Sequence, residues 1–134
     1  MGIDFKLLNM EVKELTKAEE QIMQVLWKLN SAFVKEVIDE LPEPKPAYNT
    51  VSTIIRILET KGFVQHQAFG KSHRYAPAIS KESYKSFATE KLLSNYFGSS
   101  VESMFSFFVN KNKIDVKEAD EILKLIEKLK IQKP

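Results

Sequence analysis

The chain contains no cysteine among its 134 residues. This absence excludes disulfide scaffolds, thiol catalysis, iron–sulfur clusters and every zinc or copper site built on cysteine. Histidine is also scarce, since His66 and His73 are the only two and no H-E-x-x-H motif occurs. The sequence therefore predicts neither a metal site nor a cofactor.

Other features are equally sparse. Glycine and proline number only four and five, too few for a low-complexity chain. No apolar run approaches the roughly 18 residues of a membrane span. Residues 1–12 lack a long apolar core, so we do not expect a secretory signal. These absences favour a cytoplasmic protein of one domain, or of a small domain with an appendage.

Apolar residues recur at helical spacing in the first half of the chain. The segment 15–29 opens on Thr16 and Glu19, which have the spacing of a capping box. A shorter helix is predicted over 34–41, and the three closely spaced prolines that follow it end the helix. A third helix is predicted over 49–61.

After Gly62 the apolar period changes from that of a helix to that of a strand. Residues 63–69 and 72–76 are predicted strands, joined by a turn at Gly70 and Lys71. His66 and His73 fall on this hairpin, which we call the wing. We interpret them as wing residues and not as metal ligands, because no third ligand lies nearby in the sequence.

Three more helices are predicted over 80–97, 101–109 and 115–130. Ser99 and Asp115 each stand three residues before a glutamate, so both are predicted N-caps.

Three helices followed by a hairpin within about 65 residues is the order of a winged helix-turn-helix. The predicted fold class is mostly α with a small β-hairpin. We expect a winged-helix DNA-binding domain over residues 12–79 and a helical dimerisation domain of three helices over 80–131. No phosphate-binding loop and no nucleophile–base pair is recognisable, so we do not expect an enzyme.

The net charge of +2 hides two segments of opposite sign. Between Lys45 and Tyr75 there are five basic residues and one acidic residue. Between Leu15 and Glu43 there are three basic residues and six acidic ones. A segregated positive field of this kind is what phosphate binding uses, which favours DNA as the partner.

The third helix and the hairpin supply the candidate DNA contacts. On the helix these are Tyr48, Asn49, Thr50, Ser52, Thr53 and Arg56. On the wing, the candidates for phosphate contact are Lys71, Ser72, His73 and Arg74. Such side chains bond to base edges or phosphates. The alternative is that the helix residues only cap the helix or face water, and that the hairpin is only solvated.

Four segments in order resemble the penicillinase repressor (BlaI/MecI/CopY) family. They are LTKAEEQIMQVLW at 15–27, YNTVSTIIRILETKGFV at 48–64, RYAP at 74–77 and LLSNYFGSS at 92–100. The resemblance extends over nearly all of 15–130. It implies a homodimeric winged-helix repressor that binds palindromic operators in front of resistance or homeostasis genes. It also places Asn49, Thr50, Ser52 and Thr53 where the recognition helix meets DNA.

The sequence departs from the family in three places. Members that respond to copper carry a C-terminal cysteine cluster, which this chain lacks. Members that respond to antibiotics often have a basic residue at the place of Ser52. Those members are cleaved at an Asn–Phe bond, and the partner implied here is a membrane metalloprotease-type sensor. The corresponding bond is Phe107–Phe108, so the asparagine is missing.

The C-terminal helices carry more apolar surface than three short helices can bury alone. We therefore expect a homodimer, and the family resemblance implies the same interface. The candidate interface residues are Leu92, Tyr96, Phe97, Phe105, Phe108, Ile122, Ile126 and Leu129. Alternatively, these residues pack onto the winged helix within one chain. Two other functions stay open: a protein–protein interaction module, or a repressor that senses a small molecule among its C-terminal helices.

Overall fold

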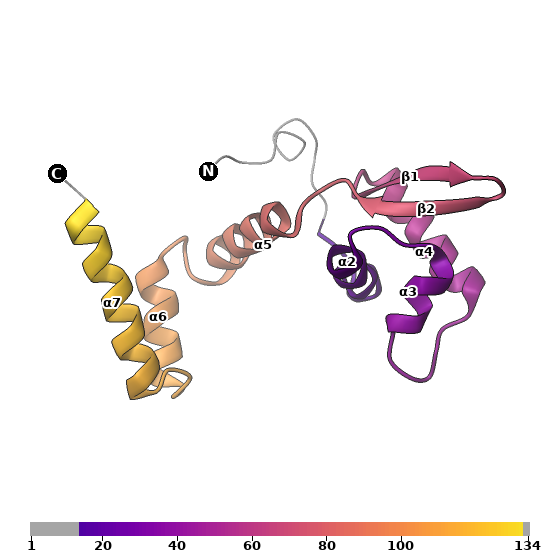
Figure 1. Ribbon diagram of the computed structural model, residues 1–134. Helices are drawn as coiled ribbons and strands as arrows, with labels where there is room; N and C mark the ends of the chain where they lie inside the picture. The colour runs from indigo at the N-terminus through magenta and orange to yellow at the C-terminus, as the bar shows by residue number, and fades with distance from the viewer. Residues whose placement is uncertain (1–13, 133–134) are drawn as a thin grey trace. The chain divides into compact units, whose positions relative to one another are not determined.

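A computed structural model describes residues 14–132 (Figure 1). The segment 1–12, and with it the predicted start of the first domain at Val12, lies outside the described residues. The described chain forms six helices and one two-stranded antiparallel sheet, in the order α2, α3, α4, β1, β2, α5, α6, α7. This is the predicted order, and the expectation of a mostly α fold with a small hairpin is confirmed.

Helix α2, Lys17–Leu29, begins at the predicted capping box. The Thr16 hydroxyl accepts a hydrogen bond from the backbone N–H of Glu19 (3.1 Å), and the Glu19 carboxylate accepts one from the N–H of Thr16 (2.9 Å). The two bonds satisfy N–H groups that have no partner within the helix. The helix ends at Asn30, whose φ of 70° turns the chain away.

Helices α3, Val34–Glu40, and α4, Tyr48–Thr60, flank the proline-rich turn. Helix α4 starts one residue earlier than predicted, and its N-cap is Ala47, which makes no side-chain cap bond. The interpretation of Asn49 and Thr50 as capping residues is therefore wrong. Both lie inside the first turn with exposed side chains.

Strands β1, Val64–Phe69, and β2, Ser72–Pro77, pair in register from the turn to the base of the hairpin. Gly70 makes the turn at a φ of 61°, a conformation that costs glycine little because it has no Cβ. Ala32 adds an antiparallel bridge to Tyr75, with two backbone hydrogen bonds of 2.8 Å. The bridge ties the wing to the loop after α2 and so fixes it relative to the helices.

A core shared by α2, α3, α4 and the wing holds these elements together. Its largest fully buried side chains are Phe63, Met23, Leu26, Ile55, Leu58, Ile79, Val37 and Val51. Trp27 packs against this core and donates a hydrogen bond from Nε1 to the carbonyl of Ile79 (2.9 Å). The interpretation of Trp27 as a packing residue is confirmed.

The described chain divides after Ala88 into two compact units, which we call the head (residues 14–88) and the tail (residues 89–132). The division falls within α5, Lys81–Tyr96, whereas the predicted domain boundary after residue 79 precedes that helix. The first turns of α5 belong to the head. Tyr84 is buried there, and its hydroxyl accepts a hydrogen bond from the N–H of Leu15 (3.0 Å).

Helices α6, Val101–Asn110, and α7, Val116–Gln132, complete the tail. The N-cap of α6 is Ser100, which accepts a bond from the N–H of Ser103 (3.0 Å), so the prediction of Ser99 is wrong by one residue. Ser99 instead extends the turn at a φ of 61°. Asp115 caps α7 as predicted.

Candidate nucleic-acid interface

Helix α4 has two further stripes beside its buried apolar one. Residues four apart lie on the same side of a helix. The stripe toward the wing, which lines the groove described below, consists of Tyr48, Ser52 and Arg56. The outer stripe is exposed and consists of Asn49, Thr50, Thr53, Ile57 and Thr60. The predicted helix contacts are thus divided between two faces.

Ser52 lies closer to the protein interior than the sequence suggests. Its residue is 9% exposed, and its hydroxyl accepts a hydrogen bond from Nη2 of Arg56 (3.1 Å). For Ser52, the alternative that the residue only faces water is therefore wrong, and the bond positions the side chain of Arg56 along the helix. Such a pair can present the guanidinium to a phosphate in a defined orientation.

The N-terminus of α4 differs from those of the other described helices. Each of the other five has a glutamate in its first turn, whereas α4 has none. With Ala47 as the cap, no side chain of the cap residue satisfies the first N–H groups. A helix start that exposes N–H groups and lacks an acid favours an anion.

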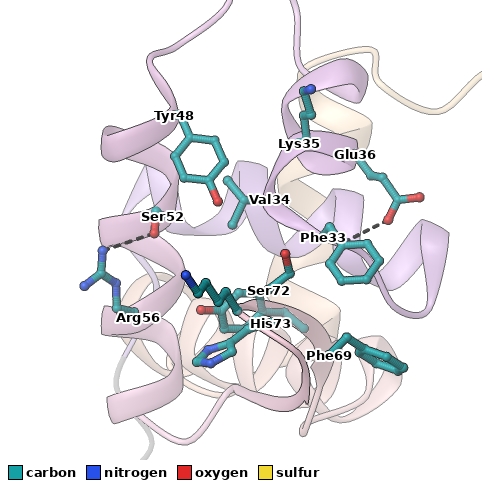
Figure 2. A pocket seen from close by; sticks show the side chains of 12 residues that line it. Phe33, Val34, Lys35, Glu36, Tyr48, Ser52, Arg56, Phe69, Ser72 and His73 are labelled. Carbon is teal, nitrogen blue, oxygen red and sulfur yellow. Dashed lines mark hydrogen bonds between the residues drawn. The ribbon is translucent and has the colours of Figure 1, made fainter.

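A groove of about 740 Å³ separates α4 from the wing, with α3 forming its third wall (Figure 2). Lys71, Ser72 and His73 line it from the wing, and Lys35 lines it from α3. Arg56 and Ser52 line it from α4, and the one acid in the lining is Glu36, whose carboxylate accepts a hydrogen bond from the N–H of Phe33 (2.8 Å). The other lining residues are aromatic or aliphatic. A groove of this lining combines cations and hydroxyl groups with flat apolar surface, which suits a sugar–phosphate backbone.

The two basic residues of the wing have different environments. Lys71 is exposed at the tip, next to Gly70, and forms no ion pair with any described acid. Arg74 is half-buried: its Nε donates to the hydroxyl of Ser31 (2.8 Å), and its guanidinium lies 5.1 Å from the ring centre of Phe33. Arg74 therefore also fastens the wing to the loop before α3.

Two of the basic residues in 45–75, Lys45 and Lys61, do not line the groove. Lys45 donates to the carbonyls of Asp39 (2.9 Å) and Leu41 (2.6 Å) at the end of α3. Lys61 is paired with Glu19. Arg56 and Lys71 remain at the groove. Lys35 joins them, and sequence reasoning missed it because it lies within the acidic segment.

The Glu19–Lys61 pair joins the start of α2 to the end of α4 at distances of 2.9 and 3.0 Å. Burial alone would raise the pKa of Glu19, since the residue is 5% exposed. Hydrogen bonds from Lys61 and from the N–H of Thr16, with the charge of Lys61, outweigh this and lower the pKa. The ionised pair therefore stabilises the position of α4 within the head.

The two histidines meet on the wing. Their rings stack with centres 4.2 Å apart and planes at 8°, and Nδ1 of His66 lies 2.5 Å from a carboxylate oxygen of Glu59. Within the part of the chain that the structure describes, no cluster of three or more metal-binding side chains occurs. The stack brings His73 to the groove and leaves His66 beside α4.

The tail leaves most of its apolar side chains in solvent. Helix α6 contains no buried residue, and Leu93 is the one buried hydrophobic among the described tail residues. Of the predicted interface residues, the exposed ones are Leu92, Tyr96, Phe105, Ile126 and Leu129. Phe97, Phe108 and Ile122 are partly buried. The bond between Phe107 and Phe108 lies inside α6, with Phe107 exposed.

The order of the helices and the hairpin is that of a winged helix-turn-helix, and lysine and arginine side chains line the groove beside its third helix. These two features define the class of the protein, which is a DNA-binding transcriptional regulator. The sequence profile of the penicillinase repressor family matches residues 15–128. The chain belongs to that family of transcriptional repressors, which are not enzymes. Within residues 14–132, no helix is both long and apolar enough to cross a membrane.

Individual relatives agree with this assignment. The penicillinase repressor of Bacillus licheniformis is 26% identical over 124 residues, which cover 92% of this chain and 97% of that protein. The methicillin resistance regulatory protein MecI of Staphylococcus aureus (strain N315) is 22% identical over 116 residues, or 86% of this chain and 94% of that protein. Among solved structures, the hsRosR-S4 complex shares the fold with a TM-score of 0.51 at 18% identity, over 85% of this chain and 95% of that one.

Proposed function

We propose that this repressor binds a palindromic operator as a homodimer, with α4 in the major groove and the wing on the flanking backbone. The observation that carries the proposal is the cationic groove between α4 and the wing, next to a helix start without an acid. The proposal assigns phosphate attraction and base reading to adjacent faces of one helix.

The proposal gives the two stripes of α4 different tasks. Asn49, Thr50 and Thr53 on the outer stripe read base edges. The phosphate contacts are made by the groove residues and the wing, which are Tyr48, Ser52, Arg56, Lys71, Ser72, His73 and Arg74. Because the operator is genomic DNA, the place of action is the bacterial cytoplasm.

The second copy of the chain is proposed to cover the exposed apolar side chains of the tail. A closed two-fold dimer would present two α4 helices about 34 Å apart, one turn of DNA. Each head alone binds weakly, and linking two heads raises the effective concentration of the second. The support for this is the apolar surface of α6 and α7, which is large for a stable monomer.

We further propose that cleavage in α6 releases the operator. A cut at Phe107–Phe108 would remove part of the apolar surface and separate the heads without altering α4. A membrane metalloprotease-type sensor is the proposed protease. The expected findings are a gene for such a sensor beside this one, and a head-containing fragment that ends near residue 107 in induced cells. An intact chain during full induction would contradict this step.

The binding proposal is tested with duplexes selected from a random pool by the full-length protein. We expect an inverted repeat to be enriched, and affinity for it to fall steeply between about 50 and about 200 mM salt. If no sequence is enriched and binding does not depend on salt, the winged helix is a protein–protein module. Sedimentation should show a dimer at micromolar concentration, and a stable monomer there would contradict the dimer.

A further inference from the structure

Ile57 is an apolar exception on the outer stripe of α4. It is 43% exposed, while the other members of that stripe are Asn49, Thr50, Thr53 and Thr60. The packing of the head does not require it, because the neighbouring Ile54, Ile55 and Leu58 already contact the core. An exposed β-branched residue also forms helix less readily than alanine or lysine. Folding alone therefore gives no reason for isoleucine at this position.

The position of Ile57 places it on the base-reading side of α4. Thr50, Thr53 and Ile57 are spaced i, i+3 and i+7, so they lie on one face and span about 10 Å along the axis. This is about three base-pair steps. Recognition helices of homeodomains read bases over the same i to i+7 span.

The chemistry of an isoleucine side chain restricts what it can recognise there. It has no donor or acceptor, so it cannot bond to a phosphate or to a polar base edge. The apolar feature of the major-groove edge of DNA is the C5 methyl group of thymine. Ile57 lines a shallow depression of about 350 Å³ together with Thr53, Arg56, Thr60 and Lys61. The depression can receive a methyl group.

We propose that Ile57 contacts a thymine methyl group and so determines one position in each half of the operator. The inference rests on the proposed function, because it requires α4 to lie in the major groove. It adds a specificity residue that makes no electrostatic contribution. Its effect is therefore the same at low and high salt, unlike that of Lys71.

The test uses the selected duplex described above and versions of it in which each thymine is replaced by deoxyuridine. This replacement removes one methyl group and leaves every hydrogen-bonding group in place. For the wild-type protein we expect one symmetry-related pair of replacements to weaken binding about fourfold per methyl group lost. The Ile57→Ala protein should bind the thymine duplex more weakly and should be insensitive to that same pair. The matched control, Ile57→Val, should keep most of the sensitivity.

Three outcomes overturn the inference. One is equal sensitivity of wild type and Ile57→Ala to every deoxyuridine replacement. Another is wild-type binding that no replacement weakens. In both, sequence-specific binding persists, so the proposed function survives. A wild-type protein that selects no duplex and shows no salt dependence instead contradicts the proposed function, and Ile57 fails with it. Circular dichroism checks that both variants keep their helices.

Discussion

The head and the tail are built from similar side chains, but the two units treat them differently. In the head, Phe63, Tyr84 and the apolar stripes of three helices are buried in one core. In the tail, Tyr96, Phe107 and Leu129 are exposed. Exposed apolar surface of this extent marks an interaction site. The head thus buries its own apolar side chains, and the tail leaves the surface on which the proposed dimer rests.

The ion pairs show the same contrast. In the head, Glu19 and Lys61 are 42 positions apart and join two helices across a partly buried site. In the tail, the pairs Glu121–Lys124 and Glu127–Lys130 are local contacts on the surface of α7. Exposed pairs of this kind contribute little to stability. These two local pairs therefore do little to hold the helices of the tail together.

The largest expected effect comes from a substitution in the tail that breaks the proposed dimer. Leu129→Glu places a charge on the exposed apolar face of α7, where the proposed partner would have to desolvate it. We expect a monomer by sedimentation and a loss of operator affinity of about 10²- to 10⁴-fold, because the two heads no longer act together.

Ile131→Glu is the matched control, since Ile131 is 82% exposed and outside the predicted interface. It should remain dimeric and bind normally. If Leu129→Glu also remains dimeric, the tail does not dimerise through this face of α7.

A core substitution should affect only the head. Phe63→Ala removes a fully buried ring and should lower the free energy of unfolding of the head by about 3–5 kcal/mol. Phe107→Ala, at an exposed position of the tail, should change the stability of the head very little. Denaturant unfolding, followed by the fluorescence of Trp27 in the head, measures both. Equal losses would mean that the units do not unfold independently.

The Glu19–Lys61 pair makes the stability of the head depend on pH. The lowered pKa of Glu19 means that its contribution is complete above about 4.5 and is lost as the pH falls through the folded-state value. Glu19→Gln should lower stability by about 1–3 kcal/mol at neutral pH. The difference from wild type should then shrink as the solution is acidified.

Glu40→Gln is the control, because the Glu40–Lys28 pair is on the surface. It should leave the unfolding curve at neutral pH unchanged. A constant gap between Glu19→Gln and wild type down to pH 3 would show that ionisation of Glu19 is not the cause.

The smallest expected effect distinguishes the basic residues of the head from those of the tail. Lys71→Ala should reduce the slope of log affinity against log salt by about 0.9 and weaken binding to all sequences equally. Lys117→Ala, an exposed lysine of the tail, should leave the slope unchanged. Thr53→Ala should leave the slope unchanged as well, but should cost about 1–3 kcal/mol at one matched base pair. An unchanged slope for Lys71→Ala would remove Lys71 from the phosphate contacts.

Local signals explain how much of the fold was predictable. The Thr16 capping box, the prolines after α3 and the glycine of the wing turn act within a few residues of themselves, so they can be read directly from the sequence. The error at Ser99 also has a local cause. Two serines in a row both stand at cap spacing, and the backbone turn after α5 decides between them.

The candidate site was predictable as a set of segments but not as a surface. Residue order identifies α4 and the wing. It does not show that Ser52 is nearly buried and bonded to Arg56, that Arg74 is anchored on Ser31, or that Lys35 reaches the groove. The burial of Ser52 and the reach of Lys35 depend on how α3, α4 and the wing pack, and the Arg74–Ser31 bond joins residues 43 positions apart, which no periodicity records.

The sequence by itself determined the order of the elements, the absence of cysteine chemistry and the resemblance to a repressor family. The tertiary structure decided where the charges lie. A count of residues treats Lys45, Lys61 and Lys71 alike, yet Lys45 donates to carbonyls at the end of α3, Lys61 pairs with the Glu19 carboxylate, and Lys71 lines the groove. The reason is physical: the sequence gives the number of charges, but folding decides where each one lies and whether an opposite charge beside it reduces its field.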